Sequence, residues 1–359
     1  MQKSLFTQKS EVLMKHFRNK ITKEENRRLK EIYQLFENLS LEDIKGFSKS
    51  EIILNEGKII NSPFVSKEII NDSKKMKHII KIKCIIGNIH FDINIHHAYL
   101  NHNLNFFIQN IMEYIQFISS FANHTSITTI IINYYLSNRE KVINSKIPNK
   151  NEVNSGSCGS NGKTAIINIW RKEEILKVTI HELIHAFGFD RYNDTQEIID
   201  HYNKRYNITS SKGINTNEAY TEIWANIINA FLITKKSKQK YKSFCYFISL
   251  EKCFCLFQAQ KIMNHSGLDH QKKININKNT NVLSYYIIRM ELYNNLSGFL
   301  NYCIQNNKNY LYLKDIESWL KFIKENNKIE KNNRRFNRFL KDNYIYKTLR
   351  MTILELRVL

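Results

Sequence analysis

Two histidines and a glutamate occur together in the stretch His181-Glu182-Leu183-Ile184-His185. On a helix, side chains four residues apart project from the same face, so both imidazoles can reach one metal ion. Neutral imidazole suits Zn²⁺, and a glutamate between two such ligands lies close enough to contact a water molecule at the metal. The spacing predicts a hydrolytic zinc centre with His181 and His185 as ligands and Glu182 as general base. The alternative is a helix with two ordinary surface histidines.

The surrounding residues favour a helix over 173–188. Gly188 follows at the position where a helix would end. The apolar face of this helix is supplied by Ile175, Leu176, Val178, Leu183, Ile184 and Phe187.

A catalytic zinc needs a third protein ligand, because two histidines alone do not hold it. The candidate segment is Asn217-Glu218-Ala219-Tyr220-Thr221-Glu222, at the start of the next predicted helix. Glu218 and Glu222 share a helix face by the same four-residue spacing. These two acids are therefore the residues to weigh as partners of the histidine pair.

A helix bearing HExxH, followed by a helix bearing NExx[ST][DE], resembles the gluzincin branch of the zincin metallopeptidases, which includes thermolysin. The resemblance covers about residues 160–235 and extends to uncharacterised metallopeptidases of large DNA viruses. It implies that Glu218 is the third zinc ligand and that Glu222 orients a zinc-binding histidine. The chain departs from thermolysin in two respects: it has Glu222 where thermolysin has Asp, and an insert at 193–216 lengthens the connection between the helices.

Other residues compete for the place of the third ligand. Asp190 is one candidate, because HELIHAFGFD superficially resembles the metzincin extension of HExxH. That pattern needs the ligand three residues after the glycine, where this chain has Arg191. Asp194 and His201 are more remote options in the irregular connection that follows. Agreement with the motif favours Glu218.

The same resemblance implies two further features. Gluzincins take the donor to the developing oxyanion from a helix downstream of the third ligand, and here that helix offers Tyr285 and Tyr286. His265 and His270 are the next candidates, in a polar segment that we predict to be a loop. Zincins also carry an edge strand upstream of the HExxH helix that pairs with extended substrate, and residues 164–170 have that position.

The run GSCGSNGKT at 156–164 partly resembles a phosphate-binding loop. The phosphate-loop pattern needs a glycine where Ser157 stands, and the element that follows is predicted to be a strand, not a helix. Residues 149–162 are therefore predicted to form a flexible polar loop.

The chain carries a formal net charge of +21, which raises the possibility of nucleic-acid binding. Lysine greatly outnumbers arginine, and the positive charge is spread along the chain. The one local exception is the basic stretch at 331–338 (KNNRRFNR). Nucleic acid is thus a possible partner that the sequence does not favour.

Neither a cleavable signal nor a run of 18 apolar residues is present, so we expect no membrane span. Six cysteines are scattered without a pairing rhythm, which favours reduced thiols and an intracellular, reducing compartment: the cytoplasm, or a virion if the protein is viral. The cysteines are Cys84, Cys158, Cys245, Cys253, Cys255 and Cys303.

The order of predicted elements points to an α+β fold. Helical spacing covers residues 1–45, and a hairpin follows with strands 78–86 and 89–96 around Gly87-Asn88. A helix is predicted over 104–122, strands over 127–136 and 164–170, and helices almost throughout from residue 218 onward. We expect an N-terminal helix and hairpin region at 1–100 and a zincin-like catalytic domain at 101–359, with a helical C-terminal portion.

Together these features predict a zinc-dependent peptidase with one Zn²⁺ per chain and a peptide or protein substrate. The alternative from another class is a basic nucleic-acid-binding or structural protein that carries a degenerate protease domain. The intact HExxH and NExxTE sets argue against degeneration, because any single substitution would have broken one of them.

Overall fold

The computed structural model describes residues 4–17, 20–98, 104–123, 125–210, 213–268, 273–276, 280–326 and 343–359. The chain forms two compact units, each assembled from separate stretches of the sequence. Unit 1 comprises Met1–Glu37, Lys141–Val153 and Asp190–Leu356, and unit 2 comprises Asn38–Glu140, Asn154–Phe189 and Arg357–Leu359. The fold is α+β, with a six-stranded mixed sheet and a largely helical C-terminal part.

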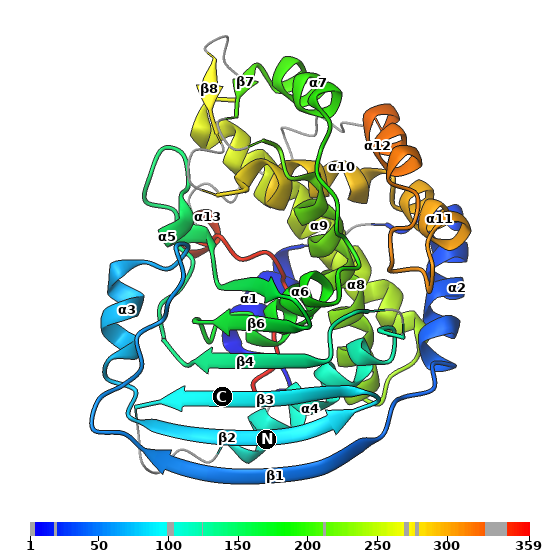
Figure 1. Ribbon diagram of the computed structural model, residues 1–359. Helices are drawn as coiled ribbons and strands as arrows, with labels where there is room; N and C mark the ends of the chain where they lie inside the picture. Colours follow the sequence, from blue (N-terminus) through cyan, green and yellow to red (C-terminus); the bar gives the residue numbers. More distant parts are fainter. Residues whose placement is uncertain are drawn as a thin grey trace. The chain divides into compact units, whose positions relative to one another are not determined.

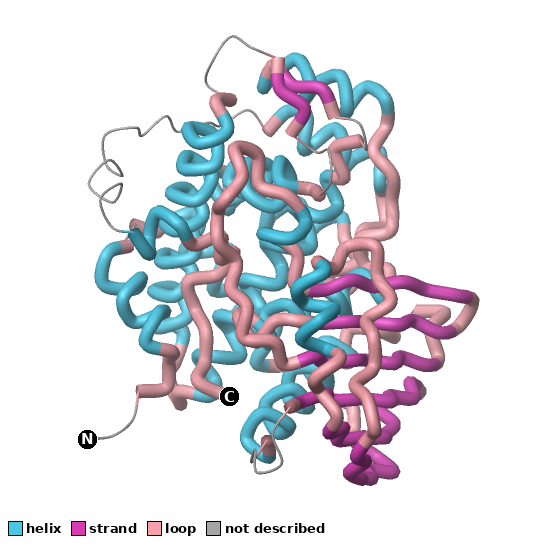
Figure 2. Tube along the Cα trace, turned by 90° about the vertical axis from the view of Figure 1, so that its left-hand side faces the viewer, coloured by secondary structure: helices cyan, strands magenta, loops and turns pink. Residues whose placement is uncertain are grey.

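Unit 2 is built on the six-stranded sheet, whose strand order is β1-β2-β3-β4-β6-β5 (Figures 1 and 2). Antiparallel pairing joins β1 to β2, β2 to β3 and β5 to β6, whereas β3, β4 and β6 run parallel. The strands are β1 Ile44–Ile53, β2 His78–Ile86, β3 Ile89–His97, β4 Thr129–Tyr135, β5 Gly156–Asn161 and β6 Thr164–Ile169.

The predicted hairpin is confirmed. Ile86 pairs with Ile89, which leaves Gly87 and Asn88 as a two-residue turn. Gly87 has φ +58°, the left-handed conformation that a type II′ turn requires at its first central residue and that glycine adopts without strain.

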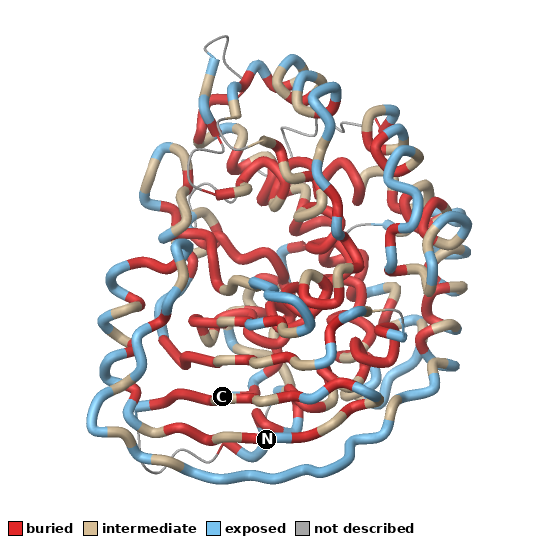
Figure 3. The backbone as a smooth tube through the Cα atoms, in the orientation of Figure 1, coloured by how far each residue is buried: buried red, intermediate tan, exposed pale blue. Residues whose placement is uncertain are grey.

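Isoleucine-rich strands and two apolar helices make the core of unit 2. Buried residues alternate along β2 and along the first part of β3, as expected for strands with one face against a core. Helix α4 (Asn105–Ser119) packs against α6 (Ile175–Phe187), and α6 also packs against β5 and β6. In contrast, β1 is exposed along nearly its whole length (Figure 3). The short helix α3 (Lys67–Ser73) also belongs to unit 2.

The regular secondary structure that the described residues of unit 1 form is helical, apart from a small parallel pair, β7 with β8. Its longest helices, α8 and α9, are buried along most of their length. The elements are α1 Gln8–His16, α2 Lys23–Glu37, α5 Lys150–Val153, α7 Gln196–Tyr206, β7 Ile208–Thr209, α8 Thr216–Lys236, α9 Tyr241–Ser266, β8 Ile274–Asn275, the π-helix η1 Leu283–Ile288, α10 Arg289–Asn294, α11 Leu296–Asn306, α12 Ile316–Glu325 and α13 Asn343–Lys347.

Aromatic side chains join the N-terminal helices to the long helices of unit 1. Tyr33 contacts Phe231 and Phe244, with ring centroids 5.5 and 5.4 Å apart. Phe36 packs against Phe231 at 5.1 Å. These edge-on and tilted contacts bury large apolar area where α2 meets α8 and α9.

Three sequence predictions for this fold need correction. Residues 1–45 are not one helical region, because α2 ends at Glu37 and Ile44 already begins β1. Residues 149–162 are not a loop, since they contain α5 and β5. Strand β6 is not the sheet edge, because β5 pairs with it and takes the end position.

Within the described part of the chain, no helix has both the length and the apolar character needed to cross a membrane. The basic stretch at 331–338 lies outside the described residues.

Candidate metal centre

The HExxH residues lie on α6 of unit 2, as the sequence predicts. Gly188 ends this helix with φ +71°, the left-handed conformation that glycine supplies at helix C-termini. The Tyr134 hydroxyl on β4 lies 3.0 Å from Thr179 Oγ1, which itself donates to the Ile175 carbonyl. The sheet therefore fixes the first turn of α6, immediately before the histidine pair.

The two histidine rings converge on one point beside the helix. The Nε2 atoms of His181 and His185 are 3.0 Å apart, and the rings meet edge to face at 81°. His181 is buried and His185 half-buried. With Zn–N bonds of about 2.0–2.1 Å, two nitrogens on a tetrahedral ion stand about 3.3 Å apart, so this pair suits zinc with little movement.

Glu182 lies between these histidines and is 5% exposed. Its carboxylate packs against the main chain of β5: a Cβ built onto Gly156 would lie 2.9 Å from Glu182 Cδ and nearer still to Oε1. Gly156 therefore makes room for the predicted base, a role that the sequence analysis missed. The strong HExxH signal gave no hint of it, because the contact comes from a segment predicted to be a flexible loop.

Glu218 and Glu222 lie on α8 of unit 1, one turn apart. The Asn281 amide donates to Glu218 Oε1 at 3.1 Å, and the Asn215 amide donates to Asn281 Oδ1 at 2.8 Å. The Glu218 carboxylate is thus oriented by an amide pair that flanks the start of α8 and the start of η1. Asn281 is a second residue that sequence reasoning missed.

Glu222 is buried and forms an ion pair with Arg289, whose Nη1 is 3.2 Å from Glu222 Oε2. Arg289 is itself fully buried. Burying a carboxylate or a guanidinium group is costly unless a partner of opposite charge binds it, so this ion pair holds both side chains in place. The implied role of Glu222 toward a zinc-binding histidine stays a prediction.

The residues that competed with Glu218 hold other parts of unit 1 together. Asp190 is buried and accepts from Thr221 Oγ1 at 2.7 Å and from the Asn217 amide at 3.4 Å. Asp194 accepts from the main-chain N–H of Thr216 at 3.0 Å and from its hydroxyl, which caps the start of α8. His201 lies on α7, with its ring against Tyr202. Both aspartates thus serve the N-terminal turns of α8.

Of the two predicted oxyanion donors, Tyr286 is fully buried and donates to the Leu349 carbonyl at 2.6 Å. Tyr285 is half-buried on the same π-helix. His265 does not lie in a loop: it belongs to α9, with its ring nitrogens 3.3 Å from the Tyr346 hydroxyl and 3.0 Å from the Ser145 carbonyl. His270 lies outside the described residues. The Tyr286 hydroxyl already donates to a main-chain carbonyl, which argues against it as the oxyanion donor. The role of Tyr285 stays a prediction.

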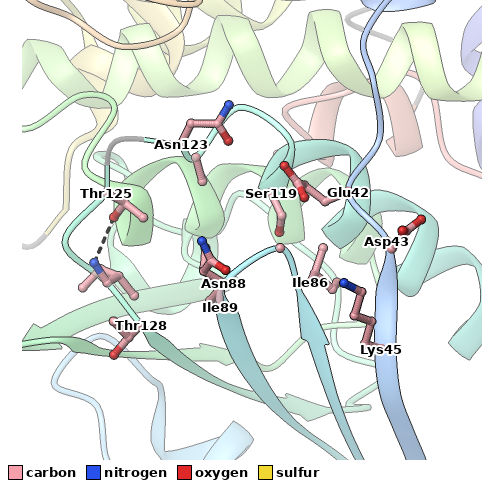
Figure 4. A pocket seen from close by; sticks show the side chains of 13 residues that line it. Glu42, Asp43, Lys45, Ile86, Asn88, Ile89, Ser119, Asn123, Thr125 and Thr128 are labelled. Carbon is pink, nitrogen blue, oxygen red and sulfur yellow. Dashed lines mark hydrogen bonds between the residues drawn. The ribbon is translucent and has the colours of Figure 1, made fainter.

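A separate pocket of about 310 Å³ lies at the Gly87-Asn88 turn of unit 2 (Figure 4). Its polar wall includes Glu42 and Asp43, and the main chain of Glu42 is fixed by bonds to Ser120 Oγ and Gln116 Nε2. None of the predicted site residues lines it. This pocket is therefore not part of the candidate metal centre.

No protein-family model, no curated protein and no solved structure matches the chain.

Proposed function

We propose that the protein is a zinc-dependent peptidase of the gluzincin type, with one Zn²⁺ held by His181, His185 and Glu218. The imidazole and carboxylate groups of these three residues could hold one ion. Two nitrogens and one oxygen form the donor set of catalytic zinc sites that keep a fourth position open for water or substrate.

The observation that carries the proposal is the arrangement on α6. Two converging imidazole nitrogens, 3.0 Å apart, flank a buried glutamate whose carboxylate lies against a sheet strand. Two ordinary surface histidines would have no need to converge, nor would a surface glutamate need a glycine opposite it. Both features favour a metal-binding site over a helix that only carries two ordinary surface histidines.

Bound zinc would supply Lewis acidity that acidifies a water molecule and polarises the scissile carbonyl. Glu182 would take the proton from that water and return it to the leaving amine, as a general base and then a general acid. The main chain of β5 holds the Glu182 carboxylate on one side, and Asn281 fixes the Glu218 carboxylate through a hydrogen bond. Tyr285 would donate to the oxyanion.

A peptide is the substrate class that the sheet edge favours. Strand β5 is an end strand, and an extended peptide can add to such an edge through main-chain hydrogen bonds. Strand β5 is also the strand against which Glu182 packs. An added substrate strand would therefore run beside the proposed base.

The test combines metal analysis with hydrolysis of a mixed peptide library. Wild type should purify with about one zinc per chain. Glu182→Gln should keep the zinc and lose about 10²–10⁴-fold in hydrolysis, because an amide cannot accept the proton. Substantial hydrolysis by zinc-loaded Glu182→Gln would refute the assignment of the base.

Two matched variants assign the third ligand. Glu218→Ala should lose zinc, whereas Asp190→Ala should keep it. The reverse result would move the ligand to Asp190. A protein that binds no zinc but binds nucleic acid with steep salt dependence would instead support the alternative of a degenerate protease domain.

A further inference from the structure

Residues 348–356 form a buried stretch of unit 1 without regular secondary structure. Every residue from 348 to 354 is buried, yet the segment contains neither helix nor strand, apart from single bridges at its two ends. Irregular chain is normally exposed, because buried N–H and C=O groups need partners that only regular structure or water readily supplies. The main chain supplies some of these partners, since the Leu349 N–H donates to the Lys141 carbonyl at 2.8 Å. Side chains supply many of the others.

Those side chains come from the surrounding helices, and several of them bind carbonyl groups of the segment. Gln258 on α9 donates to the Arg350 carbonyl at 2.6 Å, and Asn229 on α8 donates to the Leu354 carbonyl at 3.2 Å. Tyr286 on η1 donates to the Leu349 carbonyl. The segment is thus bound much as a protein binds an extended peptide, through its main chain.

Glu251 on α9 holds the other side of the same segment. Its carboxylate accepts from the Thr352 hydroxyl and from the main-chain N–H groups of Ile353 and Leu354, at 3.2 and 3.3 Å. Three donors on one buried carboxylate fix the chain direction and register at residues 352–354. This part of the segment therefore has little freedom to shift.

Arg289 joins the segment to the NExxTE helix. Its Nη1 donates to the Met351 carbonyl at 2.7 Å and to Asn226 Oδ1 at 3.1 Å, and it lies 3.2 Å from Glu222 Oε2. One guanidinium group thus contacts the segment, α8 and the second motif acid together. The planar guanidinium keeps its donors in a fixed geometry, so a fixed Arg289 fixes Glu222.

The π-helix η1 lies between the residues that contact the two motif acids. Asn281, just before η1, donates to Glu218, and Arg289, just after it, pairs with Glu222. Tyr286 within η1 is anchored to Leu349. The wider turn of a π-helix is uncommon and often occurs at functional sites. Here η1 sets the spacing between the partners of Glu218 and Glu222.

We propose that Arg289 is a positioning residue for the metal-site helix α8, held in place by residues 348–356, so that zinc affinity depends on this buried segment. The proposal rests on the proposed function, since it concerns the same α8 carboxylates. Arg289 acts through Glu222 and does not contact substrate.

The experiment measures the zinc dissociation constant by competition with a chelator, alongside thermal unfolding. Arg289→Met should weaken zinc binding by about 10–100-fold, the usual cost of losing an outer partner of a metal site. Arg289→Lys keeps the charge, but its ammonium ends one bond short of the Nη1 position that contacts all three acceptors, so its zinc affinity should lie between those of wild type and Arg289→Met.

The matched control is Arg205→Met, which breaks another buried ion pair of unit 1, that of Arg205 with Glu291 at 2.8 Å. Arg205→Met should lower the unfolding temperature and leave the zinc dissociation constant unchanged. An equal change in zinc affinity for Arg289→Met and Arg205→Met would overturn the proposal and leave zinc binding itself intact. Wild type without zinc would instead overturn the proposed function, and this inference with it.

A third variant tests the segment. Glu251 holds residues 352–354 and, among the described residues, makes no hydrogen bond to Glu218 or Glu222. Glu251→Ala should therefore raise the zinc dissociation constant, as Arg289→Met does, only if the segment positions Arg289. Zinc affinity equal to wild type in Glu251→Ala would remove the segment from the proposal.

Discussion

The Glu182 carboxylate fits against Gly156 because glycine has no side chain. The glutamate carboxylate occupies the space that a methyl group at position 156 would need. A glutamate end is flexible, so it could move away from such a methyl group at small cost in stability. Its position beside the histidines would then be lost, and with it the geometry that proton transfer needs.

Gly156→Ala is therefore expected to impair hydrolysis more than folding. A displacement of about 1 Å at a reacting group can cost about 10²-fold in rate, so kcat for a peptide substrate should fall by that order. Zinc content should stay at the wild-type value, because neither histidine is touched.

The control for this variant is on the same strand. Gly159→Ala adds the same methyl group where nothing lies within 4 Å, so its kcat should equal that of wild type. Equal kcat values for the two alanine variants would mean that the fit of Glu182 against β5 has no catalytic consequence.

At the residue scale, the sequence predicted the site residues that lie close together along the chain. His181, Glu182 and His185 share one helix, so spacing alone groups them. Arg289 was not predictable, because its partner Glu222 is 67 residues away and no local pattern links the two. Asn281 escaped for the same reason, 63 residues from Glu218.

At the element scale, strands with alternating buried residues were predicted and strands without them were not. Strands β2 and β3 alternate and are joined by a glycine turn, so their sequence suffices. Strand β5 reads Gly-Ser-Cys-Gly-Ser-Asn, has low strand propensity and buries no residue fully. Its pairing with β6 creates the strand, and pairing is not visible in a single segment.

The π-helix gives the element-scale prediction, because it separates the two tyrosines. Tyr286→Phe removes a donor from a buried carbonyl and should destabilise the protein by about 1–3 kcal/mol. Its turnover at full zinc occupancy should stay near that of wild type. Tyr285→Phe should lower turnover by about 10²–10³-fold, the range for an oxyanion donor, with little change in unfolding temperature.

Turnover measured at matched zinc occupancy, together with thermal unfolding, distinguishes the two residues. A large loss of turnover in Tyr286→Phe alone would reverse the assignment. Wild-type turnover in both variants would place the oxyanion donor outside η1.

At the scale of the whole molecule, α+β class and the run of helices followed from the order of elements, whereas the two interleaved units did not. Each unit is assembled from three stretches of chain, and only long-range packing brings such stretches together. The burial of residues 348–356 could not be predicted either, because nearly all of them are buried although the segment has no periodic pattern. Their burial depends on polar side chains of α8, α9 and η1, which the segment itself does not encode.

Buried titratable groups also make the stability of the whole molecule depend on pH, and His96 of unit 2 is the clearest example. Its side chain is 1% exposed, stacks on Tyr135 with ring centroids 4.4 Å apart, and has no hydrogen bond to either ring nitrogen among the described residues. Burial, together with the charges of Lys58, His97 and Lys81, lowers the pKa of His96 from 6.5 to about 4. The folded protein therefore holds this imidazole neutral at pH values where the unfolded chain protonates it.

A lowered histidine pKa contributes stability that is fully present above pH 6.5 and is lost as the pH falls toward 4. The pKa change corresponds to a loss of about 3 kcal/mol. His96→Phe keeps an aromatic ring for Tyr135 and cannot titrate, so its free energy of unfolding relative to wild type should rise by about that amount between pH 7 and pH 4. Denaturant unfolding at several pH values measures this, with the exposed His90 of the same strand replaced by Phe as the control. If the free energy of unfolding relative to wild type rises on acidification as much in His90→Phe as in His96→Phe, the role of burial is contradicted, because His96 is buried and His90 is exposed.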